Sequence, residues 1–221
     1  MNVEIHTLAW PNTDGKLVQA HTDVCKHLGL NVTYTIQRLP HGLWMNEIMS
    51  QSKADVVGFL DIDCIPLNKA VVDDAVAYCE KTKSFVGIAQ ASNHIPPKSH
   101  IFAAPAFFFM WKDTWAALQN PTFSEVPDLA DVAENVSYAA EMAGLRYKTL
   151  FPTHYTKDAD EGPWHLHTYG VYGIGTHFEG GVFHLYQARM NNNVDLFVET
   201  AKNVIDGKPF NNGLMKACRE V

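Results

Sequence analysis

The sequence lacks basic clusters and long apolar runs, and each absence excludes a class of protein. Lys and Arg number 17 of 221 residues against 24 Asp and Glu, for a formal net charge of −7. Binding along a nucleic-acid backbone needs clustered cations, so we expect no nucleic-acid partner. No apolar stretch reaches the ~20 residues of a membrane-spanning helix, and Met1–His6 lacks the basic start and apolar core of a signal peptide. We therefore expect a cytoplasmic protein without an integral membrane segment.

The sequence also lacks paired cysteine motifs. Cys25, Cys64, Cys79 and Cys218 are scattered, with no CxxC spacing. Such cysteines are typical of reduced, buried thiols and not of a zinc knuckle or a disulfide framework. With 47% hydrophobic and 19% charged residues, the chain has a globular composition, and its length suits one domain over residues 1–221.

What is present is an alternation of apolar segments typical of strands and helices, which predicts an α/β fold with a mainly parallel central sheet. Ligands of such sheets bind just past the carboxyl ends of the strands. The Gly-, His- and Pro-rich segment Pro152–Gly181 predicts a long functional loop. Expected strands are Val3–Leu8, Val32–Ile36, Val56–Leu60, Phe85–Ala89, Phe102–Trp111, Tyr147–Phe151 and Val182–Tyr186, and expected helices are Lys16–Leu28, Leu43–Met49, Asn68–Glu80, Asp128–Ala143 and Val194–Ile205.

Asp61 and Asp63 directly follow the apolar strand Val56–Leu60. Residues two apart on a strand point to the same side, so both carboxylates should face the crevice while Ile62 points into the core. Two hard oxygen ligands suit Mg²⁺ or Mn²⁺, and their mutual repulsion favours a bound cation that can neutralise a diphosphate. Asp158-Ala-Asp160 repeats the pattern in a polar loop, where we expect no metal.

The segment Val56-Val-Gly-Phe-Leu-Asp-Ile-Asp-Cys-Ile-Pro66 resembles the DxD segment of GT-A-fold glycosyltransferases. The resemblance extends loosely over most of the chain and implies a single Rossmann-type domain. Its nucleotide-binding half would be residues 1–110, and its acceptor-side half, with the metal-site strand, residues 111–221. It implies transfer of a sugar from a nucleoside-diphosphate sugar, with a UDP-sugar favoured, to a sugar, lipid or protein acceptor. Mn²⁺ or Mg²⁺ would be the cofactor.

The resemblance also implies roles for single residues. Metal ligands would be Asp61, Asp63 and His184, the last in Val182-Phe-His-Leu-Tyr-Gln-Ala-Arg189, with His177 as a rival. Arg189 would contact the diphosphate, and Asp61 the metal or the ribose. Thr7, Ala9 and Trp10, around the end of the first strand, would contact the nucleotide.

A carboxylate on the helix starting at Asp128 would accept the proton of the acceptor hydroxyl. The candidates are Asp131 and Glu134, which are three apart and share a helix face. The adjacent Glu-Asp pair of the family is absent from this helix, so an ordinary acidic first turn is the alternative.

Other interpretations stay open. A sugar-phosphate nucleotidyltransferase has a similar sheet, but its Gly-rich basic loop is absent after the first strand, and a non-catalytic sugar or nucleotide binder would share the fold. Ala103–Trp111 is expected to pack in the core or to form an aromatic wall for a sugar ring. The His-rich segment favours either an iron or zinc site or a mobile lid with glycine hinges; its residues are His165, His167, Gly170, Gly173, Gly175, His177 and Glu179.

Overall fold

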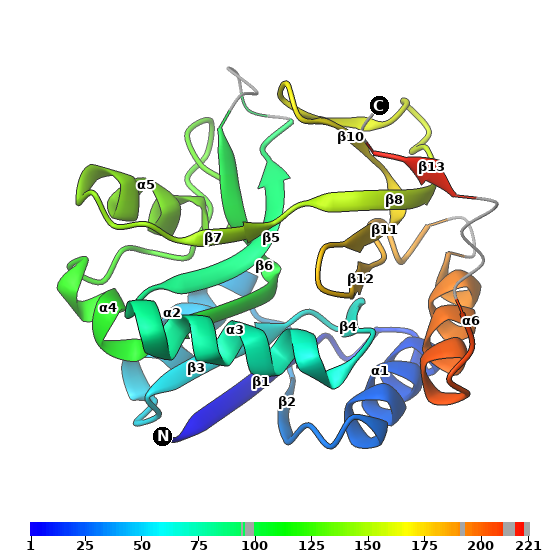
Figure 1. Ribbon diagram of the computed structural model, residues 1–221, viewed down its shortest axis with the longest axis horizontal. Coiled ribbons are helices and arrows are strands. Elements are labelled where there is room, and N and C mark those ends of the chain that lie inside the picture. The colour runs from blue at the N-terminus through cyan, green and yellow to red at the C-terminus, as the bar shows by residue number, and fades with distance from the viewer. Residues whose placement is uncertain (94, 96–99, 191–192, 210–214, 219–221) are drawn as a thin grey trace.

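A computed structural model describes residues 1–93, 95, 100–190, 193–209 and 215–218 (Figure 1). Its main sheet has six strands in the order β2-β1-β3-β6-β5-β7. All except β6 run in one direction, because β6 alone pairs antiparallel with its neighbours β3 and β5. The α/β class and the mainly parallel central sheet are thus confirmed. The strands are β1 (Val3–Ala9), β2 (Val32–Ile36), β3 (Val56–Leu60), β5 (Phe85–Ala91), β6 (Ile101–Trp111) and β7 (Lys148–Leu150).

A second, antiparallel sheet has the order β13-β8-β11-β12-β4. Its strand β4 follows β3 after only residues 61–63, so this turn carries the chain from one sheet to the other. The prediction of a long loop over Pro152–Gly181 is therefore wrong, because most of that segment forms short, paired strands. The strands of the second sheet are β4 (Cys64–Pro66), β8 (Pro152–Lys157), β11 (Ile174–Phe178), β12 (Val182–His184) and β13 (Lys216–Ala217). β9 (Trp164–Leu166) and β10 (Gly170–Tyr172) form a separate hairpin.

Helices cover both faces of the main sheet. α1 and α3 pack on one face, seen in front in Figure 1, and α2, α4 and α5 pack on the other. α6 packs against α1 and β12, beside the second sheet. The helices are α1 (Gly15–His27), α2 (His41–Gln51), α3 (Lys69–Thr82), α4 (Lys112–Ala117), α5 (Glu134–Met142) and α6 (Val194–Ile205).

The aromatic run of β6 forms the centre of the core. Phe107 and Phe109 pack on the α3 side of the sheet, and Phe108 packs on the α2 side, as the two-residue period of a strand requires. All three are fully buried, so the expectation of core packing is confirmed and the alternative of a sugar-binding wall is wrong. Gly58 on β3 lies against Phe109, where an added Cβ would come within 2.4 Å of the ring.

A capping residue explains where α3 begins, and left-handed residues explain where α5 begins. Asn68 Oδ1 accepts a hydrogen bond from the amide of Val71 at 3.0 Å, which caps α3 as expected. The helix expected from Asp128 begins instead at Glu134, because Asp128 and Ala133 have φ angles of 62° and 69°, outside the right-handed helical region. Gly144 adopts the left-handed conformation expected after this helix.

All four cysteines are free and buried, as the scattered spacing predicts. Burial raises the pKa of the Cys25 thiol to about 11 and that of Cys79 to about 12, so these thiols stay protonated and unreactive at neutral pH. Among the helices that the structure describes, none has both the length and the apolar character needed to cross a bilayer.

Candidate metal and nucleotide site

The turn between β3 and β4 brings two carboxylates and one imidazole together. One donor atom each from Asp61, Asp63 and His184 lies within 4.8 Å of the other two. Backbone pairing sets this up, because β12 pairs with β4 and places His184 opposite Cys64. Asp61 and Asp63 lie in the turn itself, where Ile62 is half-buried, so the turn and not strand alternation brings the carboxylates together.

The donor set fits a hard divalent ion. His184 Nε2 lies 3.4 Å from Asp63 Oδ1, and two ligands of one octahedral ion, each ~2.1 Å from it, are about 3 Å apart. Two carboxylate oxygens with one imidazole nitrogen suit Mn²⁺, and Mg²⁺ accepts the oxygens. Within the part of the chain that the structure describes, this is the one group of three such side chains close enough to share an ion. His165, His167 and His177 are outside it, which removes the support for a separate iron or zinc site.

The sequence did not predict His41, whose imidazole lies beside the Asp61 carboxylate. His41 is the first residue of α2, and its Nε2 lies 3.1 Å from Asp61 Oδ1. Burial lowers the pKa of His41, but neighbouring carboxylates, Asp61 first, outweigh it and hold this pKa above its usual value. Burial also raises the pKa of Asp61, but His41 and then His184 offset it and bring the pKa below its usual value. The position of His41 just past β2, at the carboxyl edge of the sheet, was the signal available in the sequence.

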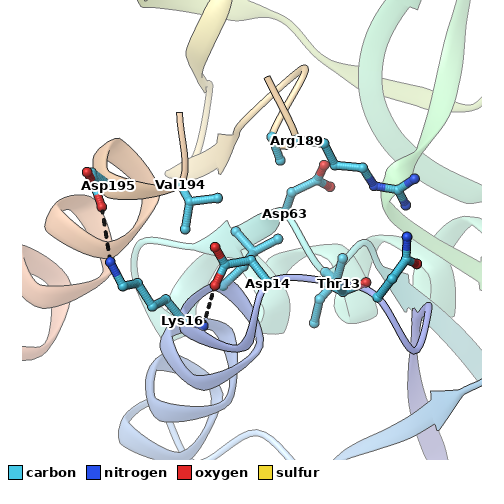
Figure 2. A pocket seen from close by; sticks show the side chains of 11 residues that line it. Thr13, Asp14, Lys16, Asp63, Arg189, Val194 and Asp195 are labelled. Carbon is cyan, nitrogen blue, oxygen red and sulfur yellow. Dashed lines mark hydrogen bonds and ion pairs between the residues drawn. The ribbon is translucent and has the colours of Figure 1, made fainter. Parts of the chain in front are cut away.

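A cavity of about 560 Å³ opens beside Asp63 (Figure 2). Arg189 lines it with Asp63, and an ion pair between Lys16 and Asp195 spans 3.7 Å on its other side. The N-terminus of α1 forms its floor, where Asp14 Oδ1 accepts the amide of Lys16 at 2.8 Å. Arg189 thus lies next to one candidate metal ligand, and Lys16 lies across the cavity from it. Two cationic side chains in one cavity suit a phosphorylated ligand.

A second cavity, about 800 Å³, lies on the side of Trp10, Arg38 and His41. Trp10 links the two cavities, since its ring lies 5.6 Å from the guanidinium carbon of Arg38 and 4.6 Å from that of Arg189. Of the three residues expected to contact a nucleotide, Trp10 is the one that reaches a cavity. Thr7 and Ala9 are buried in β1.

The two candidate acids differ in their surroundings. Asp131 is half-buried. Asp61 first, and Asp131 to the smallest extent, outweigh burial and raise the pKa of His41. Burial first, and Asp131 to the smallest extent, raise the pKa of Tyr186. Gln90 Nε2 donates to Asp131 Oδ2 at 3.3 Å, and Tyr186 donates to the other end of the Gln90 amide at 3.4 Å. Tyr186 packs its ring 4.0 Å from that of His184, so Asp131 is connected to the metal group. Glu134 is only 2% exposed.

The histidines of the His-rich segment are outside the candidate metal group, although β11 pairs directly with β12 and places Thr176 opposite His184. His165 is exposed in β9, where its amide donates to Asn93 Oδ1 at 2.9 Å, and His167 forms the turn after β9 with a φ of 49°. His177 lies in β11 opposite His154, and burial lowers its pKa to about 4. Of the expected hinge glycines, Gly173 packs against Lys157 and Tyr155, where an added Cβ would meet the Lys157 carbonyl at 2.5 Å. Part of the expected lid is thus packed into the second sheet.

No protein-family model matches the chain, and no curated protein matches it. Solved structures that match it include glycosyltransferases and nucleotidyltransferases. A mannosyltransferase from Pyrobaculum calidifontis in complex with GDP-Man and Mn²⁺ matches with 12% identity and a TM-score of 0.46, over 67% of this chain and 54% of that one. A glycosyltransferase from Streptococcus pneumoniae matches with 12% identity and a TM-score of 0.44, over 67% and 45%.

The 4-diphosphocytidyl-2C-methyl-D-erythritol synthase from Anaerococcus prevotii matches with 10% identity and a TM-score of 0.44, over 68% of this chain and 86% of that one. The region matched is therefore about half the length of the two glycosyltransferases. Likenesses of this strength do not distinguish one reaction from the other.

Proposed function

We propose that this chain is a metal-dependent glycosyltransferase that takes a sugar from a nucleoside-diphosphate sugar, with UDP-sugars the first donors to test. The observation that carries the proposal is the convergence of Asp61, Asp63 and His184 beside a cavity that also presents Arg189. Asp63 and His184 would bind Mn²⁺ or Mg²⁺ directly, and Asp61 would bind the metal or the ribose. We also propose that residues 1–221 act as one domain, because the Asp61–Asp63 turn joins both sheets.

The donor would lie across the two cavities. Arg189 would contact the diphosphate next to Asp63, and the exposed part of Trp10 would stack on the base. Arg189 already packs against Trp10, so binding of a diphosphate would exchange this contact for a charge-assisted one. A bound divalent ion would supply neutralisation of the charge that develops on the leaving diphosphate.

The remaining chemistry would fall to Asp131. The acceptor hydroxyl would attack the anomeric carbon, and the bond from that carbon to the diphosphate oxygen would break. The hydroxyl proton would pass to the Asp131 carboxylate, and the nucleoside diphosphate would leave. Asp131 suits this role better than Glu134, because it is half-exposed and connected through Gln90 and Tyr186 to the metal group.

Calorimetry tests the binding half of the proposal. UDP and GDP are titrated into the wild-type chain with and without Mn²⁺, and into Asp63→Ala with Mn²⁺. We expect binding that requires Mn²⁺ and weakens on the order of 100-fold or more in the variant, since a ligand should matter at least as much as the residues that orient it. Asp160→Ala, from the other Asp-x-Asp segment, is the matched control and should bind as the wild type does. Equal binding by Asp63→Ala and wild type would remove the proposed site.

Product analysis tests the reaction. The chain is incubated with Mn²⁺, a panel of nucleotide sugars and a panel of sugar, lipid and peptide acceptors, and separately with nucleoside triphosphates and sugar 1-phosphates. Release of nucleoside diphosphate in the first incubation is the expected result. Release of pyrophosphate in the second incubation would instead identify a nucleotidyltransferase, and binding without any turnover would identify a non-catalytic binder.

A further inference from the structure

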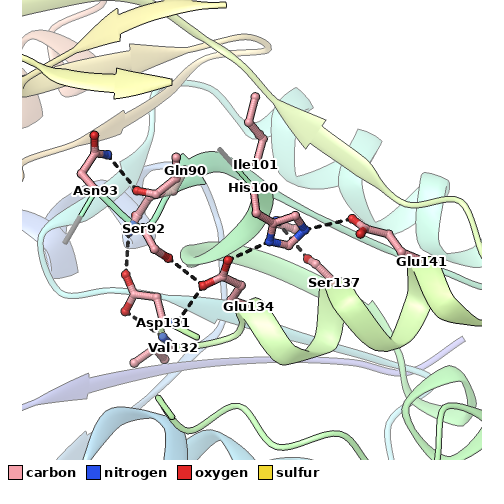
Figure 3. A network of polar contacts seen from close by, with 12 residues as sticks. Gln90, Ser92, Asn93, His100, Ile101, Asp131, Val132, Glu134, Ser137 and Glu141 are labelled. Carbon is pink, nitrogen blue, oxygen red and sulfur yellow. Dashed lines mark hydrogen bonds and ion pairs between the residues drawn. The ribbon is translucent and has the colours of Figure 1, made fainter. Parts of the chain in front are cut away.

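Glu134 accepts hydrogen bonds on both of its carboxylate oxygens (Figure 3). Oε2 accepts from the Ser92 hydroxyl at 2.6 Å and from the backbone amide of Asp131 at 2.8 Å. Oε1 lies 2.7 Å from Nδ1 of His100. Protein donors thus occupy three of the roughly four lone-pair sites of this carboxylate. Glu134 is also only 2% exposed, so it is far less accessible to a substrate than the half-buried Asp131.

His100 supplies the positive charge of this cluster. Its Nε2 lies 3.1 Å from Glu141 Oε1, and its ring stacks on Tyr138 with centroids 4.0 Å apart. With a carboxylate oxygen at each ring nitrogen, both nitrogens are placed to donate, which requires the imidazolium form. Glu134 is thereby held as an anion between β5, β6 and α5.

The hydrogen bond from the Asp131 amide to Glu134 closes the turn before α5, in which one residue has an uncommon backbone conformation. Ala133 has a φ of 69°, a left-handed conformation that costs a non-glycine residue free energy. Glu134 reaches back from the first turn of α5 to the amide three residues earlier, as in one half of a capping box. The Asp131 carboxylate accepts the amide of Val132 at 2.8 Å on one oxygen and Gln90 on the other. Hydrogen bonds therefore orient both the backbone of Asp131, through Glu134, and its carboxylate, through Val132 and Gln90.

We infer that Glu134 is a positioning residue that sets the orientation of Asp131, and that His100 holds Glu134 in place for this purpose. The inference rests on the proposed function, in which Asp131 accepts the acceptor proton. The sequence offers Asp131 and Glu134 as equivalent candidates for the base. Under this inference Asp131 accepts the proton, and Glu134 orients Asp131. Two carboxylates three residues apart thus have separate tasks.

Nuclear magnetic resonance of the full chain tests the structural step without any substrate. An amide that donates to a carboxylate has a strongly downfield proton resonance, and we expect this for Asp131 in the wild type. Glu134→Gln should move this resonance upfield. If Glu134→Gln does not fold, His100→Gln replaces it as the test and should move the resonance upfield to a smaller extent. Glu80→Gln makes the same charge change at an exposed residue near the end of α3, on the other face of the main sheet, and should leave the Asp131 resonance in place.

Kinetics with a donor identified by the product analysis tests the functional step. Glu134→Gln should lower kcat by about 100-fold, the scale expected for a misplaced catalytic group, while KM for the donor and Mn²⁺-dependent UDP binding stay at wild-type values. Glu80→Gln should stay within about twofold of wild type. An Asp131 resonance that does not move in Glu134→Gln, or a loss of UDP binding equal to the loss of kcat, would overturn the inference. Failure of wild-type UDP binding would instead count against the proposed function and leave the resonance test intact.

Discussion

Two segments of this chain have the pattern Asp-x-Asp, and each directly follows a strand. Asp61-Ile-Asp63 follows β3, where β12 of the second sheet delivers His184. Asp158-Ala-Asp160 follows β8, where β13 delivers Lys216, which forms an ion pair with Asp158. A histidine can share an ion with two carboxylates, whereas a lysine neutralises one of them. The neighbouring strand, and not the pattern, decides which segment can bind metal.

Removal of His184 should have the largest effect on Mn²⁺ binding and should make the first segment resemble the second. In His184→Ala the first segment loses the neighbour that distinguishes it from the second, and we expect Mn²⁺ affinity to fall at least about 100-fold. Calorimetry with Mn²⁺ alone measures this. His177→Ala, also in the second sheet but outside the group, is the control and should retain wild-type affinity. Equal losses in the two variants would mean that the ligands have been misassigned.

Added metal should stabilise the chain through the first segment only. At a free Mn²⁺ concentration 100 times its Kd, the free energy of unfolding should rise by about 2.7 kcal/mol, or about 5–10 °C in Tm for a chain of this size. Scanning calorimetry with and without Mn²⁺ measures the shift. Asp158→Asn should show the same shift as wild type, and Asp63→Asn should show little or none. A shift of the same size in Asp63→Asn would place the metal elsewhere.

The cluster around Glu134 offers a third case, in which a half-buried histidine pairs with a buried carboxylate. His100→Gln should lower the free energy of unfolding by about 2 kcal/mol near pH 6, because it removes a charged hydrogen-bond partner from Glu134. Burial raises the pKa of Glu134, but its hydrogen bonds, His100 first, bring it below its usual 4.5; burial lowers the pKa of His100, but Glu134 and Glu141 bring it above its usual 6.5.

The pH dependence of that contribution follows from the two shifts. The part due to Glu134 is complete above pH 4.5 and is lost as the pH falls through its lowered pKa. The part due to His100 is complete below pH 6.5 and is lost as the pH rises through its raised pKa. Urea unfolding from pH 3 to 9 should therefore show the largest difference between wild type and His100→Gln between about pH 4.5 and 6.5. A difference that does not change with pH would contradict the ion pair.

The second Asp-x-Asp segment should give the smallest effect. Lys216 and Asp158 are 50% and 37% exposed at their side chains, so solvent screens their attraction. Lys216→Ala should change the free energy of unfolding by less than about 1 kcal/mol and should leave Mn²⁺ affinity unchanged. New Mn²⁺ binding at Asp158 and Asp160 in this variant would show that the lysine alone had suppressed a second site.

Much of the fold could be predicted because local periodicity was strong. The bounds of β2, β3 and α6 match the expected segments, since each is an apolar or clearly amphipathic run. β8 to β11 were missed because they are short and several contain glycine or histidine. β8 and β11 also depend on pairing with strands that are not their neighbours in the chain. The late start of α5 was missed because non-glycine residues at Asp128 and Ala133 adopt left-handed conformations.

The residues of the candidate site also differ in how far the sequence could predict them. Asp61 and Asp63 could be proposed from their place after a buried strand, and His184 only through the resemblance to a family. His41 and Gln90 were missed, because each acts through a contact between elements that are distant in the chain. Local sequence records which residues end a strand, but it does not record which side chain another element brings against them.

The passage of the chain from β3 directly into β4 has a consequence for the order of folding. β1, β2 and β3 can assemble from the first sixty residues or so, which hold both carboxylates of the turn. β4 finds its partner β12 only after more than a hundred further residues have been made. Because closing so long a loop is slow, we expect the metal group to be completed late, after the first part of the main sheet has formed. During synthesis, β4 would therefore wait as an unpaired edge until residue 184 arrives.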